Sequence, residues 1–237
     1  MAYLRFLTLS LLIIASISPA QTIADESAAN QLTEQEKQDG WMLLFDGKST
    51  RQWMSIEEKP LAETHVQDGA LNPHPCKYML VYEKPLTDFV LQLDFKLTSK
   101  CNSGIFVRTS SLKPRPGKDV GYNGIEIAID DTTTAGFHDT GAFYDLVAPN
   151  TNSMKPAGEW NHVQITSNGA VMEVEINGVP VNRINLDEWK SPGKRPDGSD
   201  HKFDTAWKDH PRTGYIGLQD HGSDCWYRNI KLKHLKP

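Results

Sequence analysis

The chain has 237 residues, with 25 Lys and Arg against 30 Asp and Glu and a formal net charge of −5 at pH 7. This acidic balance supplies no basic field for a polyanion, which argues against nucleic acid as a partner. The length fits one large domain with a sizeable core.

The first residues carry the features of a secretory signal peptide. Arg5 is followed by an apolar run over residues 6–17 and by the small residues Ser18-Pro19-Ala20, which predicts cleavage after Ala20. The run holds about a dozen residues, whereas a bilayer span needs roughly 20. We therefore expect export to the periplasm or the extracellular space without a membrane anchor, and a mature chain with 24 basic and 30 acidic residues, because Arg5 is the one charged residue removed.

The next segment, residues 21–39, is polar and has no periodic apolar face. It precedes an abrupt apolar stretch, Gly40-Trp41-Met42-Leu43-Leu44-Phe45. We expect residues 21–39 to be a flexible leader and residues 40–237 to form a single domain.

From residue 40 onwards the dominant hydrophobic period is two, which is typical of β-strands. In residues 90–97 the side chains of Leu91, Leu93, Phe95 and Leu97 point to one face, and polar residues point to the other. The same alternation recurs in residues 125–129, 172–176, 216–218 and 230–232. Asn177-Gly178 is a strong signal for a two-residue hairpin turn, since both residues tolerate positive φ. Many strands without intervening helices predict an all-β fold, an antiparallel β-sandwich or jelly roll.

Three long loops are expected where Pro, Gly and charged residues concentrate, over residues 110–121, 131–158 and 186–213. Loops this long in a compact domain are usually functional or disordered. The middle loop is dense in groups that bind ligands or transfer protons: His138, Asp139, Tyr144, Asp145 and Lys155.

Three cysteines, Cys76, Cys101 and Cys225, allow at most one internal disulfide in an exported protein. Their spacing matches no zinc motif. A disulfide and small buried hydrophobic residues are both open interpretations.

Strand parity places several polar side chains opposite the apolar core face, because residues two apart in a strand share a face. The sets are Glu126, Ala128 and Asp130; Tyr215, Gly217, Gln219 and His221; and Gly104, Phe106 and Arg108. If these strands are neighbours, their polar faces form one floor with a carboxylate, an amide, an imidazole and a guanidinium. Each residue also has an ordinary structural interpretation. Glu126 would be a solvated strand residue, Arg108 would pair with Asp94 or Glu126, and His221 would be a turn residue.

Five ordered sequence blocks resemble the 3-keto-disaccharide hydrolase (DUF1080) family over about residues 40–235. They are Cys101-Asn102-Ser103-Gly104-Ile105-Phe106-Val107-Arg108, Gly124-Ile125-Glu126-Ile127, Thr140-Gly141-Ala142-Phe143-Tyr144, Lys155-Pro156-Ala157-Gly158-Glu159-Trp160-Asn161 and Gly214-Tyr215-Ile216-Gly217-Leu218-Gln219-Asp220-His221-Gly222. The resemblance implies a concanavalin A-like jelly roll and the cleavage of glycosides that carry a ketone at sugar carbon 3. The family often has Gln at the position of Ala128, so one sugar contact is expected to be missing.

For such a substrate we expect elimination, since the ketone acidifies the hydrogen on carbon 2 and a base can remove it. The candidate bases are Glu126 and His221, and the candidate cations for the enolate are Arg108 and Lys155. The residues expected to position sugar hydroxyls are Asn102, Tyr144 and Gln219.

A divalent metal held by Glu126, Asp130 and His221 is an alternative to the cation, although these residues lack a close-spaced ligand motif. No glycine-rich turn for a nicotinamide cofactor appears, so a separate sugar 3-dehydrogenase is expected to make the ketone.

Other functions remain open from the sequence. In an ordinary glycoside hydrolase the two carboxyl groups lie about 5 to 9.5 Å apart, whereas Glu126 and Asp130 are separated by roughly 13 Å along a strand. A second carboxylate would then have to come from the loop over residues 131–158. A non-catalytic lectin-like carbohydrate-binding module and a structural cell-surface module are further alternatives, because fold does not fix function.

Overall fold

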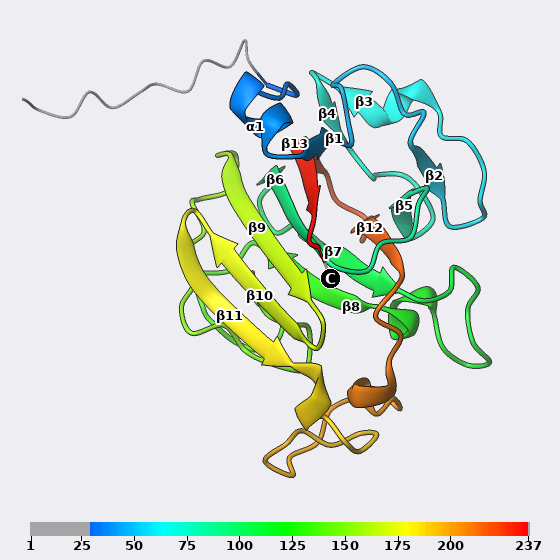
Figure 1. Cartoon of the computed structure of the whole chain (residues 1–237), viewed down its shortest axis with the longest axis vertical. Helices are drawn as coiled ribbons and strands as arrows, with labels where there is room; N and C mark the ends of the chain where they lie inside the picture. Colours follow the sequence, from blue (N-terminus) through cyan, green and yellow to red (C-terminus); the bar gives the residue numbers. More distant parts are fainter. Residues whose placement is uncertain (1–28, 237) are drawn as a thin grey trace, which may run out of the picture.

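The computed structural model describes residues 29–236, and the predicted signal peptide lies outside them. Two antiparallel sheets pack face to face (Figure 1), which confirms the predicted all-β sandwich of the concanavalin A-like, jelly-roll class. The larger sheet has the order β11 (Val179–Asn185), β10 (Val171–Ile176), β9 (Asn161–Asn168), β6 (Phe89–Leu97), β13 (Cys225–His234), β4 (Ala70–Leu71) and β3 (Val66–Gln67), with β1 (Trp41–Leu43) also paired to β13. The smaller sheet has the order β2 (Trp53–Ser55), β5 (Met79–Tyr82), β12 (Tyr215–Gln219), β7 (Asn102–Thr109) and β8 (Ile125–Asp130).

Helical structure in the described residues is short. It comprises the α-helix α1 (Glu34–Gln38) and the 3₁₀ turns η2 (Glu63–His65), η3 (Val120–Asn123), η4 (Leu186–Glu188) and η5 (Trp207–Asp209). Within residues 29–236 no helix has the length and apolar character needed to cross a membrane.

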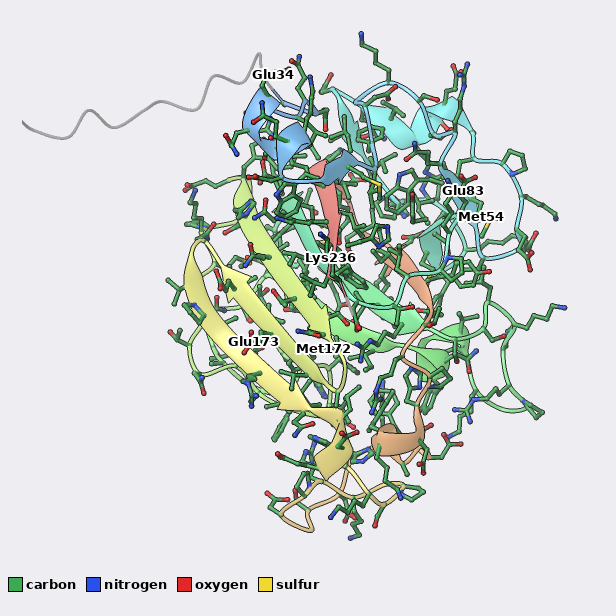
Figure 2. All side chains as sticks on the ribbon, in the orientation of Figure 1. Glu34, Met54, Glu83, Met172, Glu173 and Lys236 are labelled. Atoms are coloured by element: carbon green, nitrogen blue, oxygen red, sulfur yellow. The ribbon has the colours of Figure 1, made fainter. Side chains whose placement is uncertain are left out.

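The core lies between the sheets and follows the predicted alternation. In β6 the side chains of Phe89, Leu91, Leu93 and Phe95 are fully buried, and the residues between them are half-buried on the outer face. In β10 the buried Met172 and the exposed Glu173, both labelled in Figure 2, illustrate the same change of face. Burial of this continuous apolar face supplies the main driving force for folding.

The turn between β10 and β11 has the predicted hairpin geometry. Asn177 and Gly178 both have positive φ, at 52° and 78°, and β10 pairs directly with β11. This turn matches the right-handed twist of the flanking strands.

Residues 30–39 differ from the expected flexible leader because they dock on β13. The Asn30 N–H donates to Asn229 Oδ1 at 2.6 Å, and the Asn229 N–H donates to Asn30 Oδ1 at 2.9 Å. Helix α1 begins with a reciprocal capping box between Thr33 and Glu36. The Glu36 carboxylate also pairs with Lys231 Nζ at 2.7 Å. A search for apolar periodicity does not detect polar docking of this kind.

All three cysteines are free thiols. Cys101 and Cys225 are buried in the core, whereas Cys76 is half-buried. Burial raises the pKa of the Cys225 thiol well above its ordinary value.

Candidate functional site

A cavity of ≈130 Å³ lies on the outer face of the smaller sheet. Its lining residues are Tyr78, Asn102, Asp119, Gly121, Tyr122, Glu126, Tyr144, Lys202, Phe203, Gln219 and His221. Strands β7, β8 and β12 supply Asn102, Glu126 and Gln219. The walls come from all three long loops that the sequence predicts, so segments far apart in the chain meet above these strands.

Glu126 extends from β8 across the neighbouring strand β7. A Cβ atom added to Gly104 would lie 2.6 Å from Glu126 Oε1, well inside contact distance. Glycine at position 104 therefore leaves the space that the Glu126 carboxyl group occupies.

The Glu126 carboxyl group is surrounded by protein atoms although it borders the cavity. Burial raises the pKa of Glu126 to about 8, the nearby Asp119 adds to the increase, and Lys202 opposes it. Within residues 29–236 no side chain or backbone group forms a hydrogen bond with this carboxyl group. Such a carboxyl group exchanges its proton near neutral pH, which suits a general acid or base.

Lys202 brings a cation to the cavity, held among aromatic rings. Its Nζ lies 4.1 Å from the ring centroid of Tyr144, 5.1 Å from that of Phe203 and 5.5 Å from that of Tyr122. Burial lowers the pKa of Lys202, and Glu126 is the largest influence in the opposite direction. Among the described residues Lys202 has no salt-bridge partner within 4 Å, so the aromatic rings orient its ammonium group.

Asp119 is the second carboxylate of the cavity, and it is committed to local structure. Its Oδ1 accepts hydrogen bonds from Tyr78 Oη at 3.0 Å and from the Gly121 N–H at 2.9 Å, and it caps η3. Burial, with Asp119 next in size, raises the pKa of Tyr78 far above its ordinary value. Tyr78 therefore stays protonated and donates to Asp119.

Further polar groups complete the cavity. Gln219 is buried, and its Oε1 has no hydrogen-bond partner among the described residues. A buried acceptor without a partner is costly unless a ligand or water meets it. Asn102 Nδ2 donates to Asp130 at 3.0 Å, the Tyr144 N–H donates to the Glu126 carbonyl at 2.9 Å, and His221 is exposed at the cavity rim.

Asp145 ties two of the loops together beside the cavity. Its Oδ2 accepts from the Lys202 N–H at 2.6 Å, and its carbonyl accepts from Arg195 Nη2 at 2.6 Å. The loop that carries Tyr144 and the loop that carries Lys202 are thus linked through one residue.

The expectation that Arg108 shares the face of Glu126 is wrong. Arg108 has φ of 53°, and the pairing of β7 with β12 shifts register at this point, so a bulge breaks the strand parity. Its fully buried guanidinium lies 3.4 Å from Asp88 Oδ1, next to the start of β6 in the other sheet. Burial lowers the pKa of Arg108 to about 10, and the group is packed inside the scaffold instead of lining the cavity.

Lys155 and Asp130 also lie outside the cavity lining. Lys155 is exposed, and its Nζ donates to the Trp160 carbonyl at 3.1 Å. Within residues 29–236 no group of three or more His, Cys, Asp or Glu side chains is arranged to hold a metal ion, so Glu126, Asp130 and His221 do not form the ligand set considered from the sequence.

Of the residues expected at the site, the structure brings together Asn102, Glu126, Tyr144, Gln219 and His221. The sequence did not indicate Tyr78, Asp119, Tyr122, Lys202 and Phe203 as site residues. Three of them, Asp119, Lys202 and Phe203, lie in or beside the long loops that the sequence predicts. Ala128 is buried and bonded through its backbone to Gly141 and Ala142, so it does not line the cavity.

Comparison with known proteins agrees with the architecture. Residues 40–233 match the family model described as a 3-keto-alpha-glucoside-1,2-lyase-like domain. A protein of Bacteroides thetaiotaomicron named 3-keto-disaccharide hydrolase is 24% identical over 229 residues, which cover 83% of this chain and 79% of the relative.

Two crystal structures from Parabacteroides distasonis, both described as candidate glycosyl hydrolases, superpose on the chain. One is 30% identical with a TM-score of 0.68 and covers 82% of this chain and 99% of its own. The other is 24% identical with a TM-score of 0.69 and covers 88% of this chain and 100% of its own. The second likeness concerns the fold alone.

Proposed function

Because the chain belongs to the family of 3-keto-alpha-glucoside-1,2-lyase-like domains, we propose that it cleaves 3-keto-glycosides by elimination, with Glu126 as the base. The observation that carries this proposal is the position of the Glu126 carboxyl group in the cavity, where burial raises its pKa to about 8, near neutral pH. His221 is the weaker candidate for the base, because it is exposed at the rim.

The reaction follows from the acidity of the hydrogen next to a ketone. The Glu126 carboxylate takes the proton from sugar carbon 2, and the electron pair moves to the ketone oxygen as an enolate. When the carbonyl re-forms, a double bond forms between carbons 1 and 2, the bond from carbon 1 to the glycosidic oxygen breaks, and the departing oxygen takes a proton from solvent. Addition of water across the double bond, with the proton returned to carbon 2, completes a net hydrolysis.

Lys202 is the cation that we assign to the enolate oxygen. Arg108 and Lys155 do not line the cavity, whereas the Lys202 ammonium is held there by three aromatic rings. A cation held in place beside the cavity stabilises negative charge that develops on the enolate oxygen, and Lys202 does so from an exposed position at the cavity wall. Asn102, Tyr144 and Gln219 are then the groups that position sugar hydroxyls.

An ordinary glycoside hydrolase is the second candidate, because Asp119 and Glu126 both line the cavity. The two hydrogen bonds that Asp119 accepts favour a structural role for it. In the elimination the ketone is indispensable, whereas in a two-carboxylate mechanism it has no part.

The experiment compares a 3-keto-disaccharide with its unoxidised parent, using wild type, Glu126→Gln and the exposed control Glu159→Gln. We expect turnover of the ketone alone and a slower reaction when carbon 2 carries deuterium. Turnover should fall about 10²- to 10⁴-fold in Glu126→Gln and stay unchanged in Glu159→Gln. Equal turnover of the parent would favour the ordinary hydrolase, and tight binding without turnover would favour a lectin.

The substrate itself points to a second enzyme. A hydroxyl group at carbon 3 must be oxidised before this reaction, so we propose that a separate sugar 3-dehydrogenase supplies the ketone. We also propose that the reaction takes place outside the cytoplasm, on the basis of the predicted signal peptide.

A further inference from the structure

We propose that the outer face of the larger sheet binds an acidic glycan chain bearing uronate groups, at a tryptophan surface formed by Lys96, Trp160, Trp226 and Arg228. This surface is separate from the cavity, because Lys96 and Trp226 alternate with the core residues Phe95, Leu97, Cys225 and Tyr227 of the larger sheet, whereas the cavity lies on the smaller sheet. The proposal is independent of the reaction assigned to Glu126.

The pairing register of the strands places Trp160, Lys96 and Trp226 side by side across the larger sheet. Trp226 on β13 pairs directly with Lys96 on β6, and Trp160 immediately precedes Asn161, which pairs with Phe95 on the other side of β6. Lys96 Nζ lies 4.9 Å from the ring centroid of Trp160 and 5.1 Å from that of Trp226. Figure 1 shows β9 and β6 neighbouring each other in the larger sheet. Two indoles thus flank one ammonium group on an open sheet face.

The indoles are held in place and remain partly open to solvent. Trp226 Nε1 donates to Gln67 Oε1 at 2.9 Å, and the Arg228 guanidinium carbon lies 4.0 Å from the ring centroid of Trp160. Both tryptophans are half-buried. Lys96 and Arg228 cover part of the indole faces, and the part that stays open to solvent offers apolar surface to the C–H face of a sugar ring with little loss of side-chain entropy.

The cations of the surface keep unused hydrogen-bonding capacity. In the described part of the chain Lys96 Nζ forms no salt bridge, and Arg228 donates no hydrogen bond to a protein group. The Nε of Arg228 is buried without a partner and lies 3.7 Å from Asp94 Oδ2, which is too far for a hydrogen bond. The Asp94 oxygens accept instead from His162 and Asn229. A carboxylate ligand would supply the ion-pair partner that the Lys96 ammonium lacks, whereas the charge of Arg228 already has Asp94 as its partner.

The hollow at the surface suits a chain of sugars. A cavity of ≈300 Å³ beside Trp160 and Trp226 and another of ≈650 Å³ beside Asn30 share Asp68 and Arg228 among their lining residues. Lys48, Lys96 and Arg228 line the two hollows together with Asp46 and Asp68, and Asp94 lies opposite Arg228 on the neighbouring strand, so Lys96 is the cation beside the indoles that has no ion-pair partner among the described residues. Asp46 Oδ1 is already occupied by the N–H groups of Lys48 and Ser49. The carboxylate of a uronate would pair with Lys96, an interaction that a neutral glycan does not offer.

The test is affinity electrophoresis of the whole mature chain in gels that contain polygalacturonate or, as the neutral comparison, dextran. We expect polygalacturonate alone to retard the wild type. Trp226→Ala and Trp160→Ala should each weaken binding about tenfold or more, as expected for truncating an aromatic anchor. Lys96→Gln and Arg228→Gln keep both rings and should weaken binding as well.

Two matched variants separate this surface from other effects. Gln164→Ala, on the same outer face of β9, and Glu126→Gln, in the cavity, should both bind polygalacturonate like the wild type. The proposal is overturned if polygalacturonate does not retard the wild type, if dextran retards it equally, or if loss of the indoles or the cations leaves retardation unchanged. Loss of binding in Glu126→Gln would overturn it too, since binding would then lie in the cavity.

Discussion

Replacing Glu126 by Gln should change the pH dependence of stability in a direction that the structure fixes. Burial raises the pKa of Glu126 from an ordinary value of 4.5 to about 8. The folded state therefore holds this proton more tightly than the unfolded state does. Stability is lost as pH rises from about 4.5, and the loss is complete above about 8, where the carboxylate is charged in both states.

The size of the effect follows from the same two pKa values. Between these two values, each pH unit changes the free energy of unfolding by about 1.4 kcal/mol, so the full difference is about 5 kcal/mol. Because the residue keeps some contact with solvent, we expect about 2 to 5 kcal/mol in practice. Glu126→Gln removes the charge while preserving the shape of the side chain, so the variant should be more stable than the wild type at pH 9 and nearly equal to it at pH 4.5.

Urea unfolding of the wild type and Glu126→Gln, at intervals from pH 4.5 to 9, measures this difference. The exposed Glu159→Gln serves as the control and should follow the wild type at every pH. If the free energy of unfolding had the same pH dependence in the wild type and in Glu126→Gln, the reasoning would be refuted, because the carboxyl group would then titrate alike in the folded and unfolded states. The assay needs no substrate, so its result stands apart from the proposed reaction.

The remaining predictions concern the cation, the floor of the cavity and the N-terminus. Lys202→Met should lower kcat on a 3-keto-disaccharide at least about tenfold. Because Lys202 lowers the pKa of Glu126, the variant should also move the rise of kcat/KM with pH to higher pH, and an unchanged pH profile would contradict this. Lys202→Arg should recover part of the activity. Gly104→Ala should displace the Glu126 side chain, because the added Cβ would lie 2.6 Å from its Oε1 and 2.8 Å from its Cγ. We expect kcat to fall more than about tenfold, and wild-type activity would show that the carboxyl position is not critical. Mass spectrometry of exported protein should find a mature N-terminus near Gln21, and an intact Met1 would rule out cleavage.

Strand parity predicted the part of the site that regular strands carry. Glu126 and Gln219 face the same cavity because β8 and β12 keep the two-residue period through these positions. Arg108 departs from this rule, since a residue with positive φ at a bulge re-aims its side chain and no glycine marks the position in the sequence.

Lys202 escaped prediction for a different physical reason. Its loop has no periodic pattern, and its place depends on Asp145, which is 57 residues away in the chain. Lys155, by contrast, lies in a loop of the expected kind but folds back onto the Trp160 carbonyl. Local sequence can flag a long loop, whereas the contacts that decide which lysine enters the cavity are non-local.

The bridge made by Asp145 limits how the cavity could be redesigned. Since Asp145 bonds to both Lys202 and Arg195, the loop over residues 131–158 is shaped in part by the loop over residues 186–213. A graft of one loop from a relative would leave Asp145 or its donors without their partners. Transfer of specificity between members of this family would therefore require both loops to be exchanged together, as a single cassette.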